Sequence, residues 1–443
     1  MNSAQKFIFK GYDYDLPNGV VAFNYALVLE NSEFHFTEKL TFIPPKEVIN
    51  AQTLKPVFDS LLLVLGISYW KLYCPSILET PSLLLSKEQA LFWNILYTKG
   101  LGEFYYKNKI DFRGLVSFPV SPDVVSGPVR IAPQNRSLVG IGGGKDSIVA
   151  AELLKQEQKA LTGFMLNPHP AQNNIVKLLG IEALSMQREI DPQLFDLNTR
   201  EGTYNGHIPI SAIYAFISLF AAMIYDYRYI IVSNEKSANY GNVDYLGVDI
   251  NHQWSKSEEF ENLFQNYVSS IITPDVTYFS LLRPLFEIKI VELFKDYPQY
   301  FSSFTSCNTN FKIKSEDRPL WCGRCAKCAF AFGLLAAFLP KDEVVKIFNK
   351  NLYEEQDLID IYRELLGIKN IKPFDCVGTP EEVRAAFYKA YKKGEYMNSV
   401  IMKMFEKEAL PNIGTDDEVD ASLFKTSTID NIPEEFRGII AKI

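Results

Sequence analysis

The sequence predicts an α/β protein in which a parallel sheet with flanking helices follows a smaller α+β region and precedes a helical C-terminal region. From Ser137 onward, short apolar runs alternate with amphipathic helical patterns, which is typical of a parallel sheet. Before about residue 130, apolar and polar residues alternate singly, as in half-buried strands. After about residue 335, charged helical patterns dominate. We therefore expect three regions, at residues 1–130, 131–335 and 336–443.

Composition favours a soluble globular protein and disfavours two classes of partner. The chain has 443 residues, 47% hydrophobic and 22% charged, so it can bury a sizeable core. Its net charge of −8 offers no positive field to nucleic acid, and we expect no such partner. The longest apolar run, residues 210–224, is shorter than the ~20 residues that a spanning helix needs. The N-terminus has no apolar leader, so we expect a cytoplasmic protein without membrane insertion.

The first 130 residues carry no nucleotide-binding signature. Alternating stretches at 7–12 and 34–42 predict half-buried strands. An apolar run at 57–66 predicts a helix that ends at its glycine, and a capping box at its start predicts a second helix at 86–100. Residues 102–108 are dense in aromatics and charge, which fits either core packing or a binding face for a large substrate.

The central stretch, residues 137–150, reads Ser-Leu-Val-Gly-Ile-Gly-Gly-Gly-Lys-Asp-Ser-Ile-Val-Ala. It predicts a buried strand, a glycine turn, and a helix opened by Asp146 and Ser147. Residues without Cβ atoms let backbone N–H groups close around an anion at the positive end of a helix. Lys145 adds a mobile charge and Ser147 a hydroxyl donor. The spacing matches neither a Walker loop nor a Rossmann fingerprint, and an ordinary glycine-rich turn is the alternative.

Polar clusters follow several of the strands predicted after this loop. Ligands of parallel sheets bind beyond the carboxyl ends of the strands, where these clusters fall. His207 precedes a buried helix close to that edge, and Glu235 follows a strand, where a carboxylate can bind Mg²⁺ or take a proton. We expect His35 and His252 to be ordinary packed or solvated residues. The predicted strands are 161–166, 183–190 and 229–233, the helices 174–179 and 210–224, and the polar clusters 167–169, 204–207 and 234–239.

Four of the six cysteines form a compact pattern, Cys307, Cys322, Cys325 and Cys328. Thiolates two residues apart on a glycine-containing turn can reach one tetrahedral zinc ion, and the distant Cys307 would complete the set. Because no open coordination position remains, we expect a structural zinc. A reactive thiol cluster and an iron–sulfur cluster are the alternatives. Cys74 and Cys376 are isolated in the sequence.

Residues 142–147, Gly-Gly-Gly-Lys-Asp-Ser, resemble the PP-loop, S-G-G-x-D-S, of the ATP pyrophosphatase superfamily. Members of that superfamily split ATP between the α and β phosphates and adenylate a substrate. Gly142 stands where the superfamily usually has Ser, which removes one side-chain donor. The cysteine arrangement is similar to that of the deazaguanine-nitrile synthases (QueC), which are also PP-loop enzymes.

Over most of the chain the layout resembles the UDP-N-acetylmuramoyl-L-alanyl-L-glutamate epimerase (MurL) family. The resemblance rests on the region before the loop, Gly-His-Ile-Pro at 206–209, Ser-Asn-Glu at 233–235 and Cys-Gly-Arg-Cys-Ala-Lys-Cys at 322–328. It implies an ATP- and Mg²⁺-dependent epimerase that inverts the terminal glutamate of the peptidoglycan precursor UDP-MurNAc-L-Ala-L-Glu through an acyl-adenylate.

The resemblance also implies roles for individual residues. Gly143, Gly144, Lys145, Asp146 and Ser147 would hold the phosphates, with Asp146 also a metal contact. His207 and Glu235 are the residues to test as the base that removes the glutamate Cα proton, and the first 130 residues would recognise the substrate. Two alternatives stay open: another adenylating PP-loop enzyme, QueC-like or tRNA-modifying, and a nucleotide-binding regulator without turnover.

Overall fold

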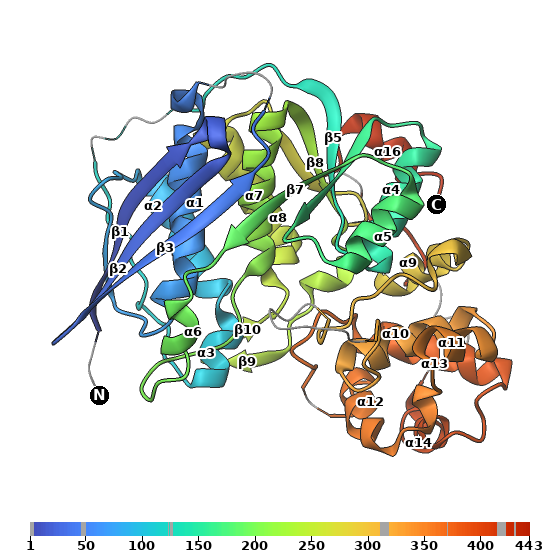
Figure 1. The fold of residues 1–443 in the computed structure, drawn as a ribbon. Coiled ribbons are helices and arrows are strands. Elements are labelled where there is room, and N and C mark those ends of the chain that lie inside the picture. The colour runs from blue at the N-terminus through green and yellow to red at the C-terminus, as the bar shows by residue number, and fades with distance from the viewer. Residues whose placement is uncertain are drawn as a thin grey trace.

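The computed structural model describes residues 4–45, 50–122, 124, 127–310, 319–369, 371–413, 422–428 and 431–443. Its centre is one nine-stranded sheet with the strand order β11-β8-β5-β6-β7-β3-β2-β1-β4 (Figure 1). The predicted mixed α/β class with a large sheet is therefore confirmed. The strands are β1 (Ala4–Asp15), β2 (Val20–Leu29), β3 (Glu33–Phe42), β4 (Ile77–Glu79), β5 (Gln134–Gly140), β6 (Leu161–Leu166), β7 (Ala183–Glu189), β8 (Tyr227–Val232) and β11 (Thr277–Ser280).

Five neighbouring strands, β11, β8, β5, β6 and β7, run parallel to one another. The strands predicted at 161–166, 183–190 and 229–233 correspond to β6, β7 and β8. The chain goes from β5 to β6 on one side, and β8 later pairs with β5 on the other side. The carboxyl end of β5 is therefore a switch point, the place where open α/β sheets bind their ligands.

Helices cover both faces of the parallel strands (Figure 1). The predicted helix 210–224 is confirmed as a buried helix, α7. Successive side chains of β5 lie on opposite faces of the sheet, since Leu138 belongs to one apolar core and Val139 to the other. One core contains α1 (Ala51–Trp70), α7 (Ile210–Tyr225) and α8 (Glu258–Tyr267), and the other contains α4 (Lys145–Gln156), α5 (Pro170–Leu179) and α9 (Glu287–Phe294).

The antiparallel strands of the N-terminal region join the same sheet, because β3 pairs with β7. A buried ion pair fixes this junction: Arg188 Nε donates to Glu38 Oε1 over 2.6 Å, and its Nη2 donates to Ser68 Oγ of α1 over 2.9 Å. Removing one partner of such a buried pair typically costs about 3–5 kcal/mol. The predicted α+β region thus shares one sheet with the parallel strands, and its boundary at residue 130 stays a prediction.

Two helices of this region test the predicted helix ends. Gly66 was expected to end the first helix, but α1 continues to Trp70. A Cβ at Gly66 would lie 2.5 Å from Phe9 Cε1, so the glycine allows close packing of α1 on the sheet and does not stop the helix. The second prediction is confirmed. Helix α2 (Lys87–Lys99) starts with the capping box of Ser86 and Gln89 and is followed by Gly100.

The C-terminal region is helical, and the predicted helix 380–393 is confirmed as α13. Helix α16 returns to the parallel strands, where the Phe436 ring lies 5.0 Å from that of Tyr229 (Figure 1). Among the described residues, no helix combines the length and the apolar character that a membrane crossing requires. The helices are α10 (Ala326–Phe338), α11 (Lys341–Phe348), α12 (Ile359–Leu365), α13 (Pro380–Lys393), α14 (Val400–Glu408) and α16 (Glu434–Ile440).

Candidate active site

The glycine loop connects β5 to α4 at the switch point of the sheet. Gly143 has a φ of +84°, which a side chain would strain, and Gly144 is the N-cap of α4 without any side-chain cap. The first N–H groups of the twelve-residue α4 therefore have no side-chain cap, and such groups can bind an anion. The Ser147 hydroxyl donates to the Gly144 carbonyl over 2.9 Å in this conformation. Gly142 has free space around it, since an added Cβ would meet nothing within 4 Å.

Lys145 is buried between two carboxylates. Its ammonium group donates to Asp146 Oδ1 over 2.6 Å and to Glu287 Oε2 at the start of α9. Burial alone would lower the pKa of Lys145, but these two carboxylates raise it above its usual value. Glu287 was not predicted from the sequence. It is a third charged group, with Lys145 and Asp146, at the end of the loop.

Glu235 lies with this group, as its place after β8 predicted. Burial is the main cause that raises the pKa of Glu235, and the charge of Asp146 raises it further. Burial and Asp146 also raise the pKa of Glu287 well above its usual value. Asp146, Glu235 and Glu287 therefore lie within electrostatic range of one another at the loop, together with Lys145 and Lys256. A carboxylate such as that of Asp146 is a suitable ligand for Mg²⁺.

A buried arginine that the sequence did not single out orders the neighbouring backbone. Arg283 donates to the carbonyl of Glu235 over 2.8 Å and to the carbonyl of Lys256 over 2.6 Å. Its charge is balanced by Glu261, whose Oε2 lies 2.8 Å from Nη2. Arg283 thus holds the Glu235 segment against the 3₁₀ turn Trp254–Lys256. This places the Lys256 ammonium within electrostatic range of Glu235 and Asp146.

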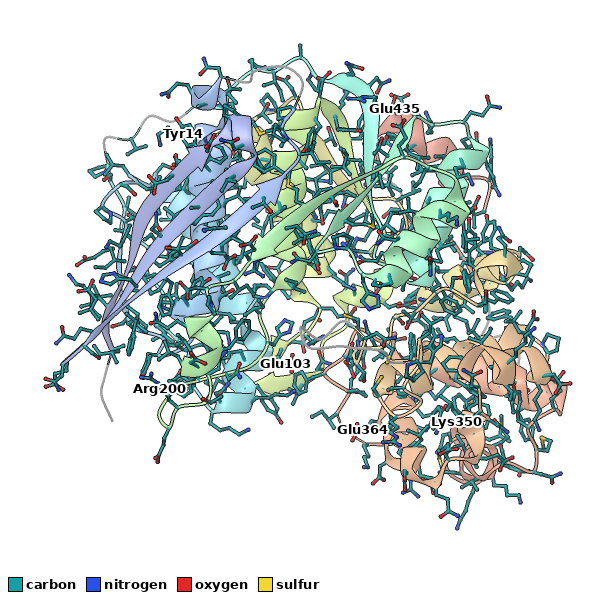
Figure 2. All side chains as sticks on the ribbon, in the orientation of Figure 1. Tyr14, Glu103, Arg200, Lys350, Glu364 and Glu435 are labelled. Carbon is teal, nitrogen blue, oxygen red and sulfur yellow. The ribbon has the colours of Figure 1, made fainter. Side chains whose placement is uncertain are left out.

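His207 belongs to a second polar cluster, with Glu103 and His252. Glu103 lies on α3 (Gly102–Asn108), near the centre of the molecule and between the N-terminal and C-terminal helices (Figure 2). Its Oε2 accepts a hydrogen bond from His252 Nδ1 and lies 3.4 Å from His207 Nδ1. The donor atoms of the three residues lie within 4.8 Å of one another, close enough for one cation, although His252 already has protein partners.

The two histidines of this cluster differ in charge. Burial, and then the charge of His252, lower the pKa of His207 to about 3, so this ring stays neutral. Burial would also lower the pKa of His252, but the neighbouring Cys376 and Glu103 side chains raise it to about 9. Burial alone would raise the pKa of Glu103, whereas its bond with His252 and the nearby charges lower it to about 2. At neutral pH the cluster therefore holds an imidazolium between a carboxylate and a thiol.

Cys376 was isolated in the sequence, yet the fold brings it to both clusters. It lies in the segment before α13, within electrostatic range of His252 and of the Lys256 and Lys327 ammonium groups. Burial would raise the pKa of this thiol, but these cations lower it well below its usual value. The side chain is half-buried and keeps some accessible surface. No local sequence pattern marks Cys376 or His252.

The four remaining site cysteines converge as their spacing predicted. The Sγ of Cys328 lies 3.6 Å from that of Cys322 and 3.5 Å from that of Cys325, and all four sulfurs are within 4.8 Å of one another. Zinc–thiolate bonds of about 2.3 Å place tetrahedral sulfurs about 3.8 Å apart, so the set fits zinc. Gly323 makes the turn possible, with a φ of +65° and Lys350 Cε only 2.5 Å from where a Cβ would stand.

The cysteine cluster also supports the glycine loop. The backbone N–H of Thr305 donates to the Gly143 carbonyl over 2.9 Å, and the N–H of Cys307 donates to Thr305 Oγ1 over 3.1 Å. Cys307 and Gly143 are thus joined through a single residue. A zinc ion at the cluster would therefore fix the segment that lies against the loop.

Two predicted polar clusters have mainly structural partners here. The Asn167 side chain bonds to the backbone of Arg188, and His169 is the N-cap of α5. Asn205 accepts a hydrogen bond from Lys71 over 3.1 Å, which ties the segment before His207 to the end of α1. These contacts fix the backbone of both segments.

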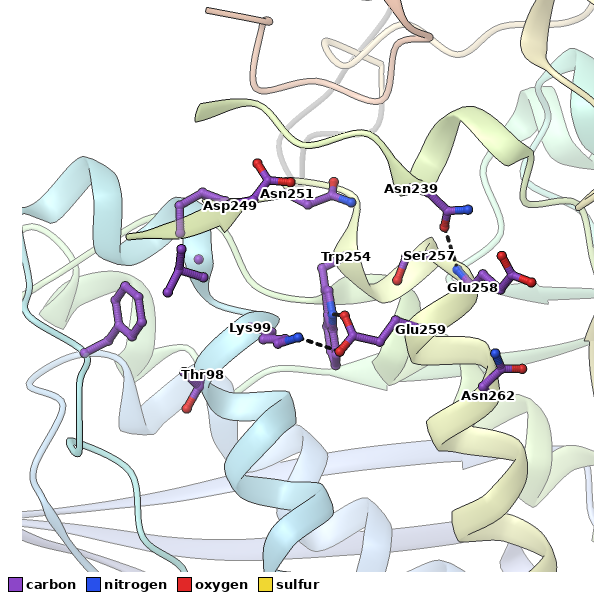
Figure 3. A pocket seen from close by; sticks show the side chains of 14 residues that line it. Thr98, Lys99, Asn239, Asp249, Asn251, Trp254, Ser257, Glu258, Glu259 and Asn262 are labelled. Carbon is purple, nitrogen blue, oxygen red and sulfur yellow. Dashed lines mark hydrogen bonds and ion pairs between the residues drawn. The ribbon is translucent and has the colours of Figure 1, made fainter. Parts of the chain in front are cut away.

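A cavity of about 510 Å³ adjoins the second cluster. Its walls come from the N-terminal region and from residues 239–262, and Lys99 and Glu259 form an ion pair of 2.5 Å across it (Figure 3). Gly102 and Asn251, which line the cavity, are the neighbours of Glu103 and His252 in the sequence. The other lining residues include Thr98, Phe112, Asn239, Asp249, Trp254 and Asn262.

Comparison with known proteins places similarity along the whole chain. The family models of the MurL N-terminal domain and the MurL C-terminal domain match residues 1–281 and 303–420. A protein of Micromonospora sp. is 34% identical over 98% of both chains. Proteins of Xanthomonas oryzae pv. oryzae and Salinispora tropica are 35% and 37% identical, over 83% and 85% of this chain and 82% of their own lengths. All three relatives are named UDP-N-acetyl-alpha-D-muramoyl-L-alanyl-L-glutamate epimerase.

Proposed function

Because the chain belongs to the MurL family, we propose that it inverts the terminal glutamate of UDP-MurNAc-L-Ala-L-Glu from L to D, in peptidoglycan precursor synthesis, and that it uses ATP to do so. The observation that supports the ATP requirement is the glycine loop at the switch point of the sheet. The open N-terminus of α4 and Lys145 suit phosphate, and Asp146 and Glu287 suit its metal counterion. The loop type corresponds to the PP-loop.

Adenylation solves the chemical problem of this epimerisation. An ionised carboxylate makes the adjacent Cα–H very hard to remove, because deprotonation would place a second negative charge beside the first. Attack of the glutamate α-carboxylate on the α-phosphorus of ATP releases pyrophosphate and gives an acyl-adenylate, in which the carboxyl group itself no longer carries a negative charge. Its Cα proton can then be taken by a base as the enolate forms. A proton delivered to the other face, followed by hydrolysis of the adenylate, gives the D product and AMP.

The residues of the loop have separate tasks in this proposal. The backbone N–H groups of Gly143 and Gly144, with Ser147, hold phosphate oxygens, and Lys145 neutralises charge that develops as pyrophosphate leaves. Asp146, with Glu287 and Glu235 nearby, would hold Mg²⁺, which supplies charge neutralisation at the phosphates when bound. The cavity beside α3 and the N-terminal region would recognise the large uridine-sugar part of the substrate.

The products of ATP cleavage test this proposal. Purified protein with ATP, Mg²⁺ and UDP-MurNAc-L-Ala-L-Glu should form AMP and pyrophosphate at a rate that depends on the sugar-peptide, together with D-glutamate in the peptide. UDP-MurNAc-L-Ala, which lacks the glutamate, is the control and should not stimulate AMP formation. Recovery of ADP and orthophosphate as the main products would contradict cleavage between the α and β phosphates.

A further inference from the structure

Two contacts bring a cysteine segment of the C-terminal region to a histidine–carboxylate pair. Glu103 of α3 bonds to His252, and Gln253, the next residue, donates to the carbonyl of Val377, which follows Cys376 in the segment before α13. A carboxylate that orients a histidine, which in turn holds a thiol, is the arrangement that activates cysteines in enzymes. Each member comes from a different part of the chain, so the arrangement exists only in the folded protein.

Lys256 links the surroundings of the Cys376 thiol to those of the glycine loop electrostatically. Lys256 lies within electrostatic range of Cys376 on one side and of Asp146 and Glu235 on the other. Lys256 is placed to stabilise the negative charge of an enolate oxygen. The charged groups that face Cys376 are Lys256, Lys327, His252, Lys372, Glu235 and Asp375.

An unpaired buried acceptor near the thiol indicates that a ligand with a hydrogen-bond donor binds here. Gln253 is 2% exposed, and its Nε2 donates to the carbonyl of Val377, the residue after Cys376, over 3.1 Å. Its Oε1 finds no hydrogen-bond partner within the part of the chain that the structure describes. A buried amide oxygen left unpaired is costly. The peptide N–H of the substrate glutamate is a donor of the required kind, and it is bonded to the reacting carbon.

We propose that Cys376 is the base that removes the Cα proton of the adenylated glutamate, with His252 and Glu103 holding it as a thiolate. This inference rests on the proposed function. In the step, the Cα–H bond breaks, the proton passes to the sulfur, and the electron pair moves onto the acyl oxygen to form the enolate. A water-equilibrated acid returns a proton to the opposite face, and the Cys376 proton is lost to solvent.

The other role for such a chain is nucleophilic attack on the adenylated carboxyl. AMP leaves as a phosphate anion and needs no proton from His252, so His252 would stay protonated. No neutral histidine partner of the thiol would then remain to activate the water that must hydrolyse a thioester. As a base, Cys376 forms no bond to the acyl carbon, so the two roles differ in whether an acyl group appears on the enzyme. An acyl adduct on Cys376 in the intact mass of the working enzyme would overturn this assignment.

Single-turnover measurements in heavy water test the proposal. Cys376→Ala and Cys376→Ser should each lower deuterium incorporation at the glutamate Cα at least about 100-fold, the usual loss for a missing general base. AMP formation in the first turnover should stay within about threefold of wild type. Cys74→Ala, which removes the other isolated cysteine, is the matched control and should retain both activities.

Two results would overturn the assignment: deuterium incorporation near the wild-type rate in both Cys376 variants, or an equal loss of AMP formation and incorporation in folded protein.

Glu103→Gln gives an independent readout for a positioning residue. It weakens the imidazolium and so raises the pKa of Cys376, and the acid limb of the exchange profile should move to higher pH. An unmoved limb would exclude the link. If the proposed function itself fails, wild-type protein will form no AMP with this substrate, and both proposals fall.

Discussion

Asp146→Asn is expected to lower substrate-dependent AMP formation at least about 100-fold. This is the loss typical when a group that stabilises charge in the transition state is removed. Asp146 is one of two carboxylates that hold the Lys145 ammonium, and it is the carboxylate of the loop itself. The neutral asparagine amide would hold the Lys145 ammonium less strongly, so Lys145 would move toward Glu287. The substitution would also remove a proposed metal ligand. Epimerisation should fall in parallel, because the loop acts before the Cα proton is removed. Radiolabelled ATP and chromatography of the products measure the effect.

The matched control for this variant lies at the other end of the same helix. Glu157 follows α4, and its side chain pairs with Lys442 at the surface over 2.6 Å. Glu157→Gln removes one charge, as Asp146→Asn does, and should leave AMP formation within about twofold of wild type. Asp146→Asn with near-normal AMP formation would show that the loop does not bind the reacting phosphates.

Cys325→Ser is expected to abolish stoichiometric zinc and to destabilise the C-terminal region by several kcal/mol. Structural zinc sites are worth about 10–16 kcal/mol in isolated peptides, because binding and folding are coupled. Cys325 is also the N-cap of α10, so its loss affects the start of a buried helix. Because Thr305 joins the cluster to Gly143, ATP binding should weaken as well. Elemental analysis, thermal unfolding and ATP titration check the three effects.

A half-buried cysteine outside the cluster provides the matched control for this substitution. Cys376→Ser makes the same atomic change outside the cluster, and it should keep the metal and the ATP affinity. Wild-type protein with neither zinc nor iron, and with four freely titrating thiols in the cluster, would contradict the structural metal. Bound iron together with acid-labile sulfide would support an iron–sulfur cluster in place of zinc.

Local signals predicted much of the fold and one half of the site. Strands 161–166 and 183–190 and helix 380–393 could be found because their apolar spacing and caps are local properties. The loop and the four-cysteine cluster have fixed spacings, and the four sulfurs converge in the structure, while the roles of these residues stay predictions. The predicted end of α1 was wrong because Gly66 packs closely against the Phe9 ring of another element. No local sequence pattern contains such a tertiary contact.

The other half of the site depends on tertiary structure. Glu103, His252 and Cys376 are separated by more than a hundred residues at each step, and nothing in their flanking sequences marks them. The aromatic- and charge-rich stretch 102–108 was the one signal near them, and it fitted core packing equally well. His207 was found from its place before α7, yet it lies with Glu103 and not at the loop. The positions of these residues depend on buried contacts between segments that are distant in the sequence.

The claim that adenylation serves to acidify a carbon can be tested by isotope exchange. The protein is incubated in heavy water with ATP, Mg²⁺ and UDP-MurNAc-L-Ala-L-Glu, and the glutamate of the product is examined by mass spectrometry and chiral chromatography. We predict D-glutamate with one deuterium at Cα, and one AMP formed for each adenylation. AMP formation with L-glutamate unchanged and without deuterium would contradict epimerisation and leave another adenylating activity in its place.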